Sequence, residues 1–558
     1  MSHLLTLHDP ASARENYLSG VWQTDTLYSL ARANATQRGA AYAVRDAARR
    51  LTWSALVAWV DAVAASLHAA GLRRGDRVSI WLPSRVESAV VLLACSRNGY
   101  VCNTSLHQNY TVAEIAALLT RIDSRALFAQ SGYGADAGTA DIFSEAAALP
   151  NLRRVFAVAP VKEPQARLPE GATPMPAAEL PHASLPPASM NPDQIVYLAF
   201  TSGTTGLPKA VMHSDNTLLA NGRSMVADWG RNERMVLLAL SPMSHHVGTV
   251  ALQQALITGG ELVVHDPSSG IAPLDWILET RANYVMGVPT HGIDLLAEVD
   301  RRGLTKLGEV ETFYMAGSPI PTETARRMLS LGAKPQNVYG MTENGSHQYT
   351  RPSDPIDVIT GTCGKACRGY EVKLWNPENP DIETAPGEVG EIGGRGGVLM
   401  LGYFNNQSAT ENSFNRSGWF MSGDLGRFDE HGNLQIVGRK KDLIIRGGHN
   451  IHPASIEEYA HRHPGVRKAA AFGVADDRLG ERVCLAIICN GAPPEPDEVL
   501  HHLARQGLSR FDMPEYFAVV TEFPMTASGK ILKRELVQWA ASGRLQPRPV
   551  RYRAEVNA

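Results

Sequence analysis

Short runs of apolar residues recur along the chain, each bounded by glycine, proline or aspartate, and several are separated by helix-like intervals. They lie at residues 235–240, 261–264, 284–288 and 312–315. Continuous apolar runs of this length are typical of strands that are buried on both faces, and helical intervals are typical of parallel crossovers. The pattern predicts a large α/β domain whose mixed, largely parallel sheets are covered by helices.

The same alternation is visible nearer the N-terminus. Apolar residues at helical spacing precede Gly71, and an apolar strand follows at residues 78–82. Ser84 and Glu87 then stand three residues apart before the next apolar helix, so we expect them to form a capping box there. Strand, turn and helix in this order are the mark of α/β architecture.

The composition excludes several classes of protein. With 558 residues, of which 44% are hydrophobic and 20% charged, the chain is too long for a single small module and too apolar for a disordered one. Its formal net charge of −3 does not favour electrostatic binding of the whole protein to nucleic acid or to an anionic membrane. Binding partners must therefore be inferred from particular sites.

The six cysteines are too few for a disulfide-built scaffold, and the pairs Cys363/Cys367 and Cys484/Cys489 lack the CxxC spacing of a zinc site. We therefore expect six reduced thiols.

The N-terminus has no basic segment followed by an apolar core, and no run approaches the roughly 20 apolar residues of a membrane span. We expect a cytoplasmic protein without a membrane span; the sequence does not decide between a monomer and a homodimer.

A polar cluster at residues 438–442, Gly-Arg-Lys-Lys-Asp, separates a glycine-rich, strand-like region from a compact segment of mixed helices and strands. We place a domain boundary there. The prediction is a large N-terminal domain, residues 1–438, followed by a small α+β domain, residues 439–558.

The segment with the clearest chemistry is a polar loop that follows an apolar strand. Residues 197–200 are apolar, and residues 201–209 read Thr-Ser-Gly-Thr-Thr-Gly-Leu-Pro-Lys. Gly203 and Gly206 let the backbone approach an anion, the four hydroxyls supply donors, and Lys209 adds a positive charge. The spacing is not the GxxxxGK[ST] of a Walker P-loop. Composition alone leaves an ordinary surface turn as the alternative.

The whole string resembles the phosphate-binding loop of the acyl-adenylate-forming superfamily, which comprises acyl-CoA synthetases, peptide-synthetase adenylation domains and beetle luciferases. Ala210 stands where many relatives have glycine. Further segments resemble the family's motifs in the family's order, and the likeness extends from about residue 28 to residue 536. These segments are residues 338–343, 418–424, 438–445 and 524–531.

The resemblance implies a binding site for ATP, Mg²⁺ and coenzyme A. Tyr339 would pack against the adenine, and Asn337 would accept a hydrogen bond from its amino group. Asp424 offers two acceptor oxygens that suit the two ribose hydroxyls. The residues implied to bind cofactors are Thr201, Ser202, Gly203, Thr204, Thr205, Gly206, Lys209, Gly317, Ser318, Pro319, Asn337, Val338, Tyr339, Gly340, Met341, Thr342, Asp424, Arg439, Asn450, Gly447 and Gly448.

The resemblance also implies catalytic roles for Lys530, Glu343, Thr204 and His245. Glu343 is the implied ligand of Mg²⁺, and Lys530 would stabilise the charge that develops as the carboxylate attacks the α-phosphorus of ATP. The second half-reaction requires Lys530 to leave, and the family achieves this by a large rotation of its small domain. Lys441 occupies the hinge position.

The acyl pocket implied by the family's motifs is lined by His245, Val247, Ala316 and Gly340. His245 would either position the substrate carboxylate or act as a base. Ser244 is smaller than the aromatic residue of many relatives, which favours a roomier pocket. Residues 212–219, Met-His-Ser-Asp-Asn-Thr-Leu-Leu, resemble cyclohexanecarboxylate–CoA ligases, so we expect an alicyclic, aromatic or medium-chain acid.

Contacts to coenzyme A are less well indicated. Gly447 and Gly448 would flank the passage for pantetheine, and Arg478 or Arg482 would meet the phosphates of CoA. Asp512 stands where relatives often carry lysine, which weakens the case for CoA contacts near it.

We therefore expect an acid–thiol ligase that makes acyl-CoA through an acyl-adenylate, with release of AMP and pyrophosphate. One alternative is a stand-alone adenylating enzyme that loads a carrier protein. Another is a catalytically silent nucleotide-binding protein, against which the presence of Lys530, Glu343 and Asp424 argues.

Overall fold

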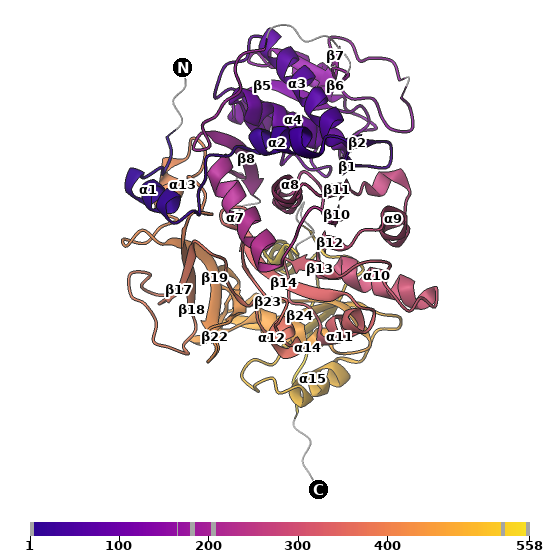
Figure 1. The fold of residues 1–558 in the computed structure, drawn as a ribbon. Coiled ribbons are helices and arrows are strands. Elements are labelled where there is room, and N and C mark those ends of the chain that lie inside the picture. The colour runs from indigo at the N-terminus through magenta and orange to yellow at the C-terminus, as the bar shows by residue number, and fades with distance from the viewer. Residues whose placement is uncertain (1–4, 165, 179–184, 202–207, 526–530, 554–558) are drawn as a thin grey trace. The chain divides into compact units, whose positions relative to one another are not determined.

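The computed structural model describes residues 5–164, 166–178, 185–201, 208–525 and 531–553 (Figure 1). The chain forms two compact units. The first comprises residues 1–372, 394–414 and 432–434, and the second comprises residues 373–393, 415–431 and 435–558.

A nine-stranded sheet forms one half of the first unit. Its six central strands, β1, β11, β10, β12, β13 and β14, are parallel to their neighbours among these six. The outer strands β2, β15 and β16 pair in antiparallel fashion. The four predicted strands between residues 235 and 315 are confirmed as β10 to β13. In spatial order the strands are β16 (Lys365–Ala366), β15 (Gly345–Tyr349), β14 (Lys334–Met341), β13 (Thr312–Ala316), β12 (Tyr284–Gly287), β10 (Val236–Ala239), β11 (Glu261–Val264), β1 (Tyr42–Arg45) and β2 (Arg50–Thr52).

A seven-stranded sheet forms the other half. All its neighbouring strands are parallel except the hairpin of β8 and β9. Its strands, in spatial order, are β7 (Thr173–Pro174), β6 (Arg154–Ala157), β5 (Ser124–Ala129), β3 (Arg77–Trp81), β4 (Val101–Asn103), β8 (Ile195–Thr201) and β9 (Lys209–Ser214).

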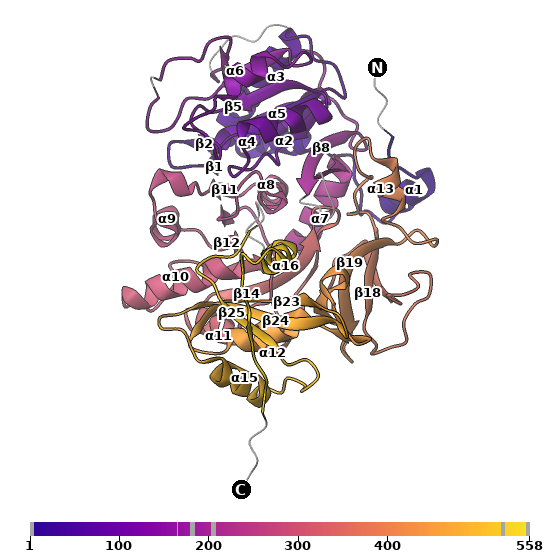
Figure 2. The same cartoon turned by 180° about the vertical axis from the view of Figure 1, so that it is seen from behind.

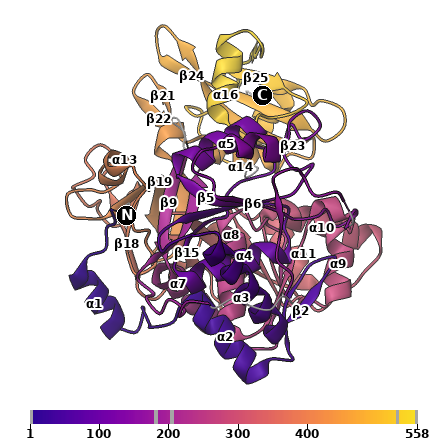
Figure 3. The same cartoon turned by 90° about the horizontal axis from the view of Figure 1, so that it is seen from above.

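Both faces of these sheets are buried under helices. On β5, Ala126 and Phe128 pack into one apolar cluster while Leu127 and Ala129 pack into another, as the two-residue period of a strand requires. Figure 3 shows α5 on one side of β5 and β6, with α3 and α4 on the other. The helices of this unit are α1 (Pro10–Leu18), α2 (Leu27–Arg38), α3 (Trp53–Ala69), α4 (Val86–Asn98), α5 (Val112–Arg121), α6 (Ile142–Ala147), α7 (Asp215–Asp228), α8 (His246–Thr258), α9 (Pro273–Thr280), α10 (Pro289–Arg301), α11 (Thr322–Ser330), α12 (Ile356–Gly361), α13 (Gln407–Glu411) and the 3₁₀ turn η1 (Pro267–Ser269).

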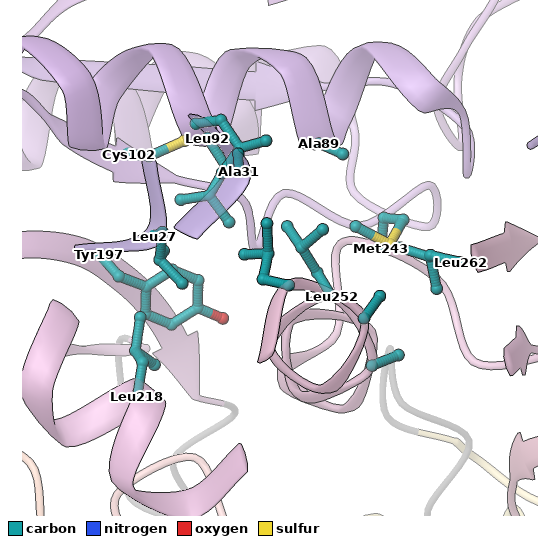
Figure 4. Close-up of a cluster of buried hydrophobic side chains, with 14 of the residues drawn as sticks. Leu27, Ala31, Ala89, Leu92, Cys102, Tyr197, Leu218, Met243, Leu252 and Leu262 are labelled. Carbon is teal, nitrogen blue, oxygen red and sulfur yellow. The ribbon is translucent and has the colours of Figure 1, made fainter. Parts of the chain in front are cut away.

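Helix α8 lies between the two sheets in both views of the ribbon (Figures 1 and 2). It packs against α2 and α7 and against β10, β11 and β12. In Figure 4, Ala89 and Leu92 of α4 face Leu252 of α8, and Tyr197 of β8 lies beside Leu218 of α7. These side chains belong to one apolar cluster that joins both sheets. The large α/β domain predicted from the sequence is confirmed.

The predicted capping box at Ser84 and Glu87 is wrong. Helix α4 begins after Arg85, which has no side-chain cap. Ser84 Oγ instead accepts a hydrogen bond from the backbone N–H of Met243, and the Glu87 carboxylate forms ion pairs with Arg85 and Arg49. Ser84 is thus bonded to a residue distant in sequence, and Glu87 pairs with the side chain of the N-cap residue Arg85 and with the more distant Arg49.

The second unit contains most of a four-stranded sheet and a mixed six-stranded one. In the latter, β24 and β25 are parallel and the other pairs are antiparallel. The elements are β17 (Tyr370–Trp375), β18 (Gly390–Gly396), β19 (Phe420–Phe428), β20 (Leu434–Arg439), η2 (Lys440–Asp442), β21 (Ile444–Arg446), β22 (His449–Ile451), α14 (Pro453–His461), β23 (Val466–Asp476), β24 (Gly480–Cys489), α15 (Pro496–Arg505), β25 (Tyr516–Val519), α16 (Lys533–Ala541) and β26 (Arg548–Pro549). The predicted small α+β module is confirmed.

All six cysteines lie among the described residues and are free thiols. Within the same residues, none of the helices combines the length and the apolar character that crossing a bilayer requires.

Candidate active site

The candidate site begins at one edge of the nine-stranded sheet. Strands β13 and β14 are parallel neighbours with Ala316 opposite Val338, so the segments that follow them emerge at the same edge. Such edges are where α/β sheets bind ligands. Gly317 follows β13 with a φ of +97°, a conformation that glycine adopts without strain. The structure thus brings the predicted 317–319 and 338–343 segments to one edge.

Gly340 is fixed as glycine by its surroundings. A Cβ atom at this position would lie 1.8 Å from the carbonyl oxygen of Gly345, where β14 and β15 shift register between Tyr339 and Met341. The Tyr339 ring lies edge-on to the buried His347 ring, with 5.3 Å between centroids. Glycine at this position therefore lets β15 come close to the segment that carries the predicted adenine residues.

The side-chain amide of Asn337 is partly used by the fold itself. Its Nδ2 donates hydrogen bonds to the carbonyl oxygens of Ile359 and Thr362, each at 2.9 Å, so both amide protons are used by the fold. Its Oδ1 is 3.9 Å from the thiol of Cys363, a weak donor. The side-chain oxygen retains the acceptor capacity that an adenine amino group would need.

Glu343 is a largely buried carboxylate, 8% exposed. The Tyr403 hydroxyl donates to its Oε1 at 2.9 Å, and the Met400 N–H donates to its main-chain oxygen at 2.7 Å. A hard carboxylate oxygen fits Mg²⁺, which is usually held by one or two carboxylates together with substrate phosphates. Among the described residues no cluster of three His, Cys, Asp or Glu side chains forms a metal cage. One carboxylate suits an ion that arrives with ATP.

Lys209 opens β9 directly opposite Thr201, the last residue of β8. Its Nζ lies 4.0 Å from the centroid of the Tyr403 ring, within the range of a cation–π contact. Ser202, Gly203, Thr204, Thr205 and Gly206 of the predicted phosphate loop lie outside the described residues, as does Lys530. Met525 and Ile531, the described residues immediately before and after the segment that contains Lys530, form an antiparallel bridge.

Asp424 and Arg439, both predicted at the ribose, pair with each other in the second unit. Arg439 Nε donates to Asp424 Oδ1 at 2.9 Å, from β20 to β19. Lys441 follows in η2, beside Lys440, whose ammonium pairs with Glu391 at 2.9 Å. The sequence did not indicate the ion pair between Asp424 and Arg439, which orients the carboxylate.

Gly447 and Gly448 form the turn between β21 and β22, with φ values of +60° and +83°. Both values lie in the left-handed region that favours glycine. Asn450 follows on β22 and is exposed. This is a tight turn with no side chains at its tip.

Arg482, one of the two arginines considered for the CoA phosphates, is already paired within the second unit. Arg482 forms ion pairs with Asp476 and, at 2.9 Å, with Glu515. Asp512 is 2.9 Å from His449 Nε2. The guanidinium of Arg482 is thus already committed to carboxylates within its own module.

Three histidines lie near the start of α8. His245 is the residue before the helix, and its ring lies 5.4 Å from that of His107. His107 Nδ1 is 3.0 Å from Ser244 Oγ, and burial lowers the pKa of His107 to about 3. Burial also lowers the pKa of His246 well below its usual value. His107 and His246 therefore add no positive charge beside the predicted acyl pocket at neutral pH.

The apolar members of the predicted acyl pocket are Val247 and Ala316. Both are half-buried and pack against the same apolar cluster between the sheets. Residues from α8 and β13, far apart in sequence, thus border the same apolar cluster.

His213, within the 212–219 string, was not predicted as a site residue, but it bonds to the residue before Glu343. It is fully buried on β9, where burial lowers its pKa to about 4, so the ring is neutral. Its Nε2 lies 2.7 Å from the main-chain oxygen of Thr342, which can only accept, so the proton is on Nε2. Nδ1, 3.0 Å from Thr217 Oγ1, then accepts. This tautomer ties the residue before Glu343 to the start of α7, and only the long-range contact reveals it.

Comparison with known proteins identifies the family of the chain. Residues 31–404 match the family of AMP-binding enzymes, and residues 455–530 match the AMP-binding enzyme C-terminal domain. The chain is 29% identical to the medium-chain fatty-acid–CoA ligase of Escherichia coli K12, over 86% of this chain and 84% of the relative. It is 31% identical to the 2-hydroxy-7-methoxy-5-methyl-1-naphthoate–CoA ligase of Streptomyces carzinostaticus, over 90% of each. The crystal structure of ATP-bound MatB from Rhodopseudomonas palustris superimposes with a TM-score of 0.78 at 28% identity, over 92% of this chain and 99% of MatB.

The fold and the matched segments define an adenylate-forming enzyme. The chain belongs to the AMP-binding enzyme family, and it is an acid–thiol ligase that uses ATP, Mg²⁺ and coenzyme A.

Proposed function

We propose that this ligase activates an alicyclic, aromatic or medium-chain carboxylic acid as its acyl-adenylate and then transfers the acyl group to coenzyme A. The observation that carries the choice of acid is the character of two members of the predicted pocket and of two histidines near the start of α8. Val247 and Ala316 are apolar, and His107 and His246 are neutral because they are buried. A pocket of this kind favours an uncharged acyl group over one with a second carboxylate. Relatives named for medium-chain and naphthoate substrates support the same class.

The roles of the site residues follow the chemistry of the two half-reactions. A carboxylate is a poor electrophile because oxide is a poor leaving group, and AMP is a good one. Glu343 would hold Mg²⁺, which neutralises phosphate charge when bound, and Lys209 would bind the departing phosphates. The Thr201–Thr205 hydroxyls and Lys530 would stabilise charge at the α-phosphate.

The nucleoside would be held by one set of residues at the adenine and another at the ribose. Gly317, Ser318, Pro319, Asn337 and Tyr339 would surround the adenine. Asp424, oriented by Arg439, would accept from both ribose hydroxyls, and Asn450 would lie on the phosphate side. Gly447 and Gly448 would leave room for pantetheine. His245 would position the substrate carboxylate, since a thiol with a pKa near 8.5 needs little help to attack an activated acyl group.

We also retain the division into residues 1–438 and 439–558, with Lys441 as the hinge, and a cytoplasmic location. The polar cluster at residues 438–442 supports the division, and η2 places Lys441 between β20 and β21.

The proposed activity is tested by screening pyrophosphate release over chemically diverse carboxylates, with and without CoA. We expect release with apolar monocarboxylates and thioester formation when CoA is added. Release only with dicarboxylates would overturn the substrate class. Failure of CoA with every acid that is adenylated, together with success of a carrier protein, would show that the enzyme loads a carrier instead.

Replacing Lys441 with proline is expected to spare adenylation and slow thioester formation. Proline fixes φ near −65° and disfavours the helical region for Lys440, so fewer conformations of the junction remain. The two half-reactions are measured separately, as pyrophosphate exchange and as consumption of pre-formed acyl-adenylate by CoA. Lys441→Ala is the matched control, because it removes the same side chain and leaves φ free. Unchanged thioester formation in the proline variant would remove the case for a hinge at this residue.

A further inference from the structure

Tyr403 lies at the centre of a set of contacts that the family motifs quoted from the sequence do not include. Only 4% of its surface is exposed. Its hydroxyl donates to Glu343 Oε1 at 2.9 Å, and its ring carries Lys209 Nζ 4.0 Å from the centroid. One side chain thus contacts both the predicted metal ligand and the predicted phosphate-binding lysine.

The main chain holds Tyr403 in this place. Val211 of β9 and Tyr403 form an antiparallel bridge. The flanking hydrogen bonds run from Met212 N to Gly402 O, from Leu401 N to Met212 O and from Phe404 N to Ala210 O, at 2.8 to 2.9 Å. The Met400 N–H then bonds the main-chain oxygen of Glu343 at 2.7 Å. Residues 400–404 therefore connect the strand that begins at Lys209 with the residue that would bind the metal.

The direction of the hydroxyl bond is fixed by chemistry. A phenol has a pKa near 10 and keeps its proton at neutral pH. An ionised carboxylate can only accept, so the phenol must donate. Among the described residues, Glu343 Oε2 has no hydrogen-bond partner. The hydroxyl thus restrains one carboxylate oxygen and leaves the other available.

We propose that Tyr403 is a positioning residue for adenylation: its hydroxyl aims Glu343 Oε2 at the Mg²⁺ that accompanies ATP, and its ring seats Lys209 beside the same phosphates. This inference rests on the proposed function. It assigns two separable tasks to one residue, since phenylalanine would keep the ring and remove only the hydroxyl.

The test is calorimetric titration of ATP into the full-length enzyme, with Mg²⁺ and with EDTA. For Tyr403→Phe we expect the gain in ATP affinity that Mg²⁺ provides to fall about tenfold, because a hydrogen bond to a charged group is lost. ATP affinity in EDTA should remain unchanged. Tyr403→Leu should in addition weaken binding in EDTA, because Lys209 loses its ring contact.

Tyr28→Phe is the matched control. Tyr28 lies on α2, away from the site. Its hydroxyl donates to Asp61 Oδ1 at 2.9 Å, and the Arg97 guanidinium lies 5.4 Å from the centroid of the Tyr28 ring, so this tyrosine also contacts one carboxylate and one cation. This variant should bind ATP as the wild type does with and without Mg²⁺. It shows what the loss of a buried phenol hydroxyl does through stability alone.

A double-mutant cycle completes the test. If Tyr403 acts through Glu343, Tyr403→Phe should have no further effect on Mg²⁺-dependent affinity in a Glu343→Gln background. A tenfold effect in both backgrounds, or a Tyr403→Phe variant that matches Tyr28→Phe, would overturn the inference while leaving the proposed function intact. If instead the wild type releases no pyrophosphate with any carboxylate, the proposed function fails and the inference fails with it.

Discussion

Carboxylate-dependent ATP–pyrophosphate exchange is expected to fall by roughly 10²- to 10³-fold when Lys530 is replaced by alanine, the loss typical of removing one group that stabilises transition-state charge. The reason is that the attacking carboxylate and the α-phosphate are both anionic, and negative charge builds up on the oxygens around the α-phosphorus as the new bond forms. In the second half-reaction no bond to phosphorus forms or breaks: the thiol attacks the acyl carbon, and AMP leaves with the electron pair of the acyl C–O bond. We therefore expect pre-formed acyl-adenylate to react with CoA at close to the wild-type rate.

Two measurements separate these steps. Exchange of labelled pyrophosphate into ATP reports adenylation, and thioester formation from added acyl-adenylate reports transfer. Lys468→Ala, on β23 of the same unit, is the control for losing a lysine from the module. Equal losses in both steps for Lys530→Ala would refute the division of labour between them.

The parts of the fold that were predictable are those in which the local residue pattern and the tertiary contacts favour the same secondary structure. The apolar runs that became β10 to β13 have no polar face because helices cover both sides of the sheet, so the pattern alone identifies them. Ser84 and Glu87 show the opposite case. Their spacing satisfies a local rule, but Ser84 bonds to Met243 and Glu87 to Arg49, both distant in sequence, and Glu87 also pairs with the neighbouring Arg85.

The site divides in the same way. Motifs such as residues 338–343 were recognisable because the chemistry resides in neighbouring residues. His213 and Tyr403 contribute through bonds to Thr342 and Glu343, 129 and 60 residues away in sequence. No local spacing encodes such contacts, so only the folded structure shows them. Asn337 lies between these cases: its position was predicted, but the use of its amide protons by Ile359 and Thr362 was not.

These contacts also change how the site can be understood energetically. Glu343 is held at its side chain by Tyr403, at its main-chain oxygen by Met400, and through the preceding residue by His213. A residue whose backbone is held at two points and whose carboxylate is held at one has little orientational freedom to lose when a ligand arrives. The structure thus supplies preorganisation at the residue where the proposed chemistry needs it.

Asp215 leads to a second large effect, on stability rather than catalysis. It is the first residue of α7, 2% exposed, and its Oδ1 accepts from the Leu27 N–H at 2.9 Å and the Ser96 hydroxyl at 3.1 Å. Burial raises its pKa from 3.8 to about 7 and outweighs both hydrogen bonds. Between these two values the folded protein keeps a proton that the unfolded chain has released. The free energy of unfolding therefore falls as the pH rises from about 4 to about 7, and the loss levels off above that.

Asp215→Asn should remove this loss. The asparagine oxygen can accept the same two hydrogen bonds but carries no charge at any pH. At about 1.4 kcal/mol per unit of pKa difference, we expect the variant to be more stable than the wild type at pH 8 by up to about 4 kcal/mol, and of similar stability near pH 4. The attraction of an anion to the helix N-terminus would reduce the difference by about 1 kcal/mol.

The measurement is chemical denaturation of both proteins at a series of pH values between 5 and 8. The diagnostic result is a stability difference that widens with pH, since a simple packing change would shift both curves by a constant amount. Asp477→Asn, which removes an exposed aspartate between β23 and β24, controls for the change in net charge and should run parallel to the wild type. A constant difference between Asp215→Asn and the wild type would mean that Asp215 is already ionised in the folded protein throughout this range.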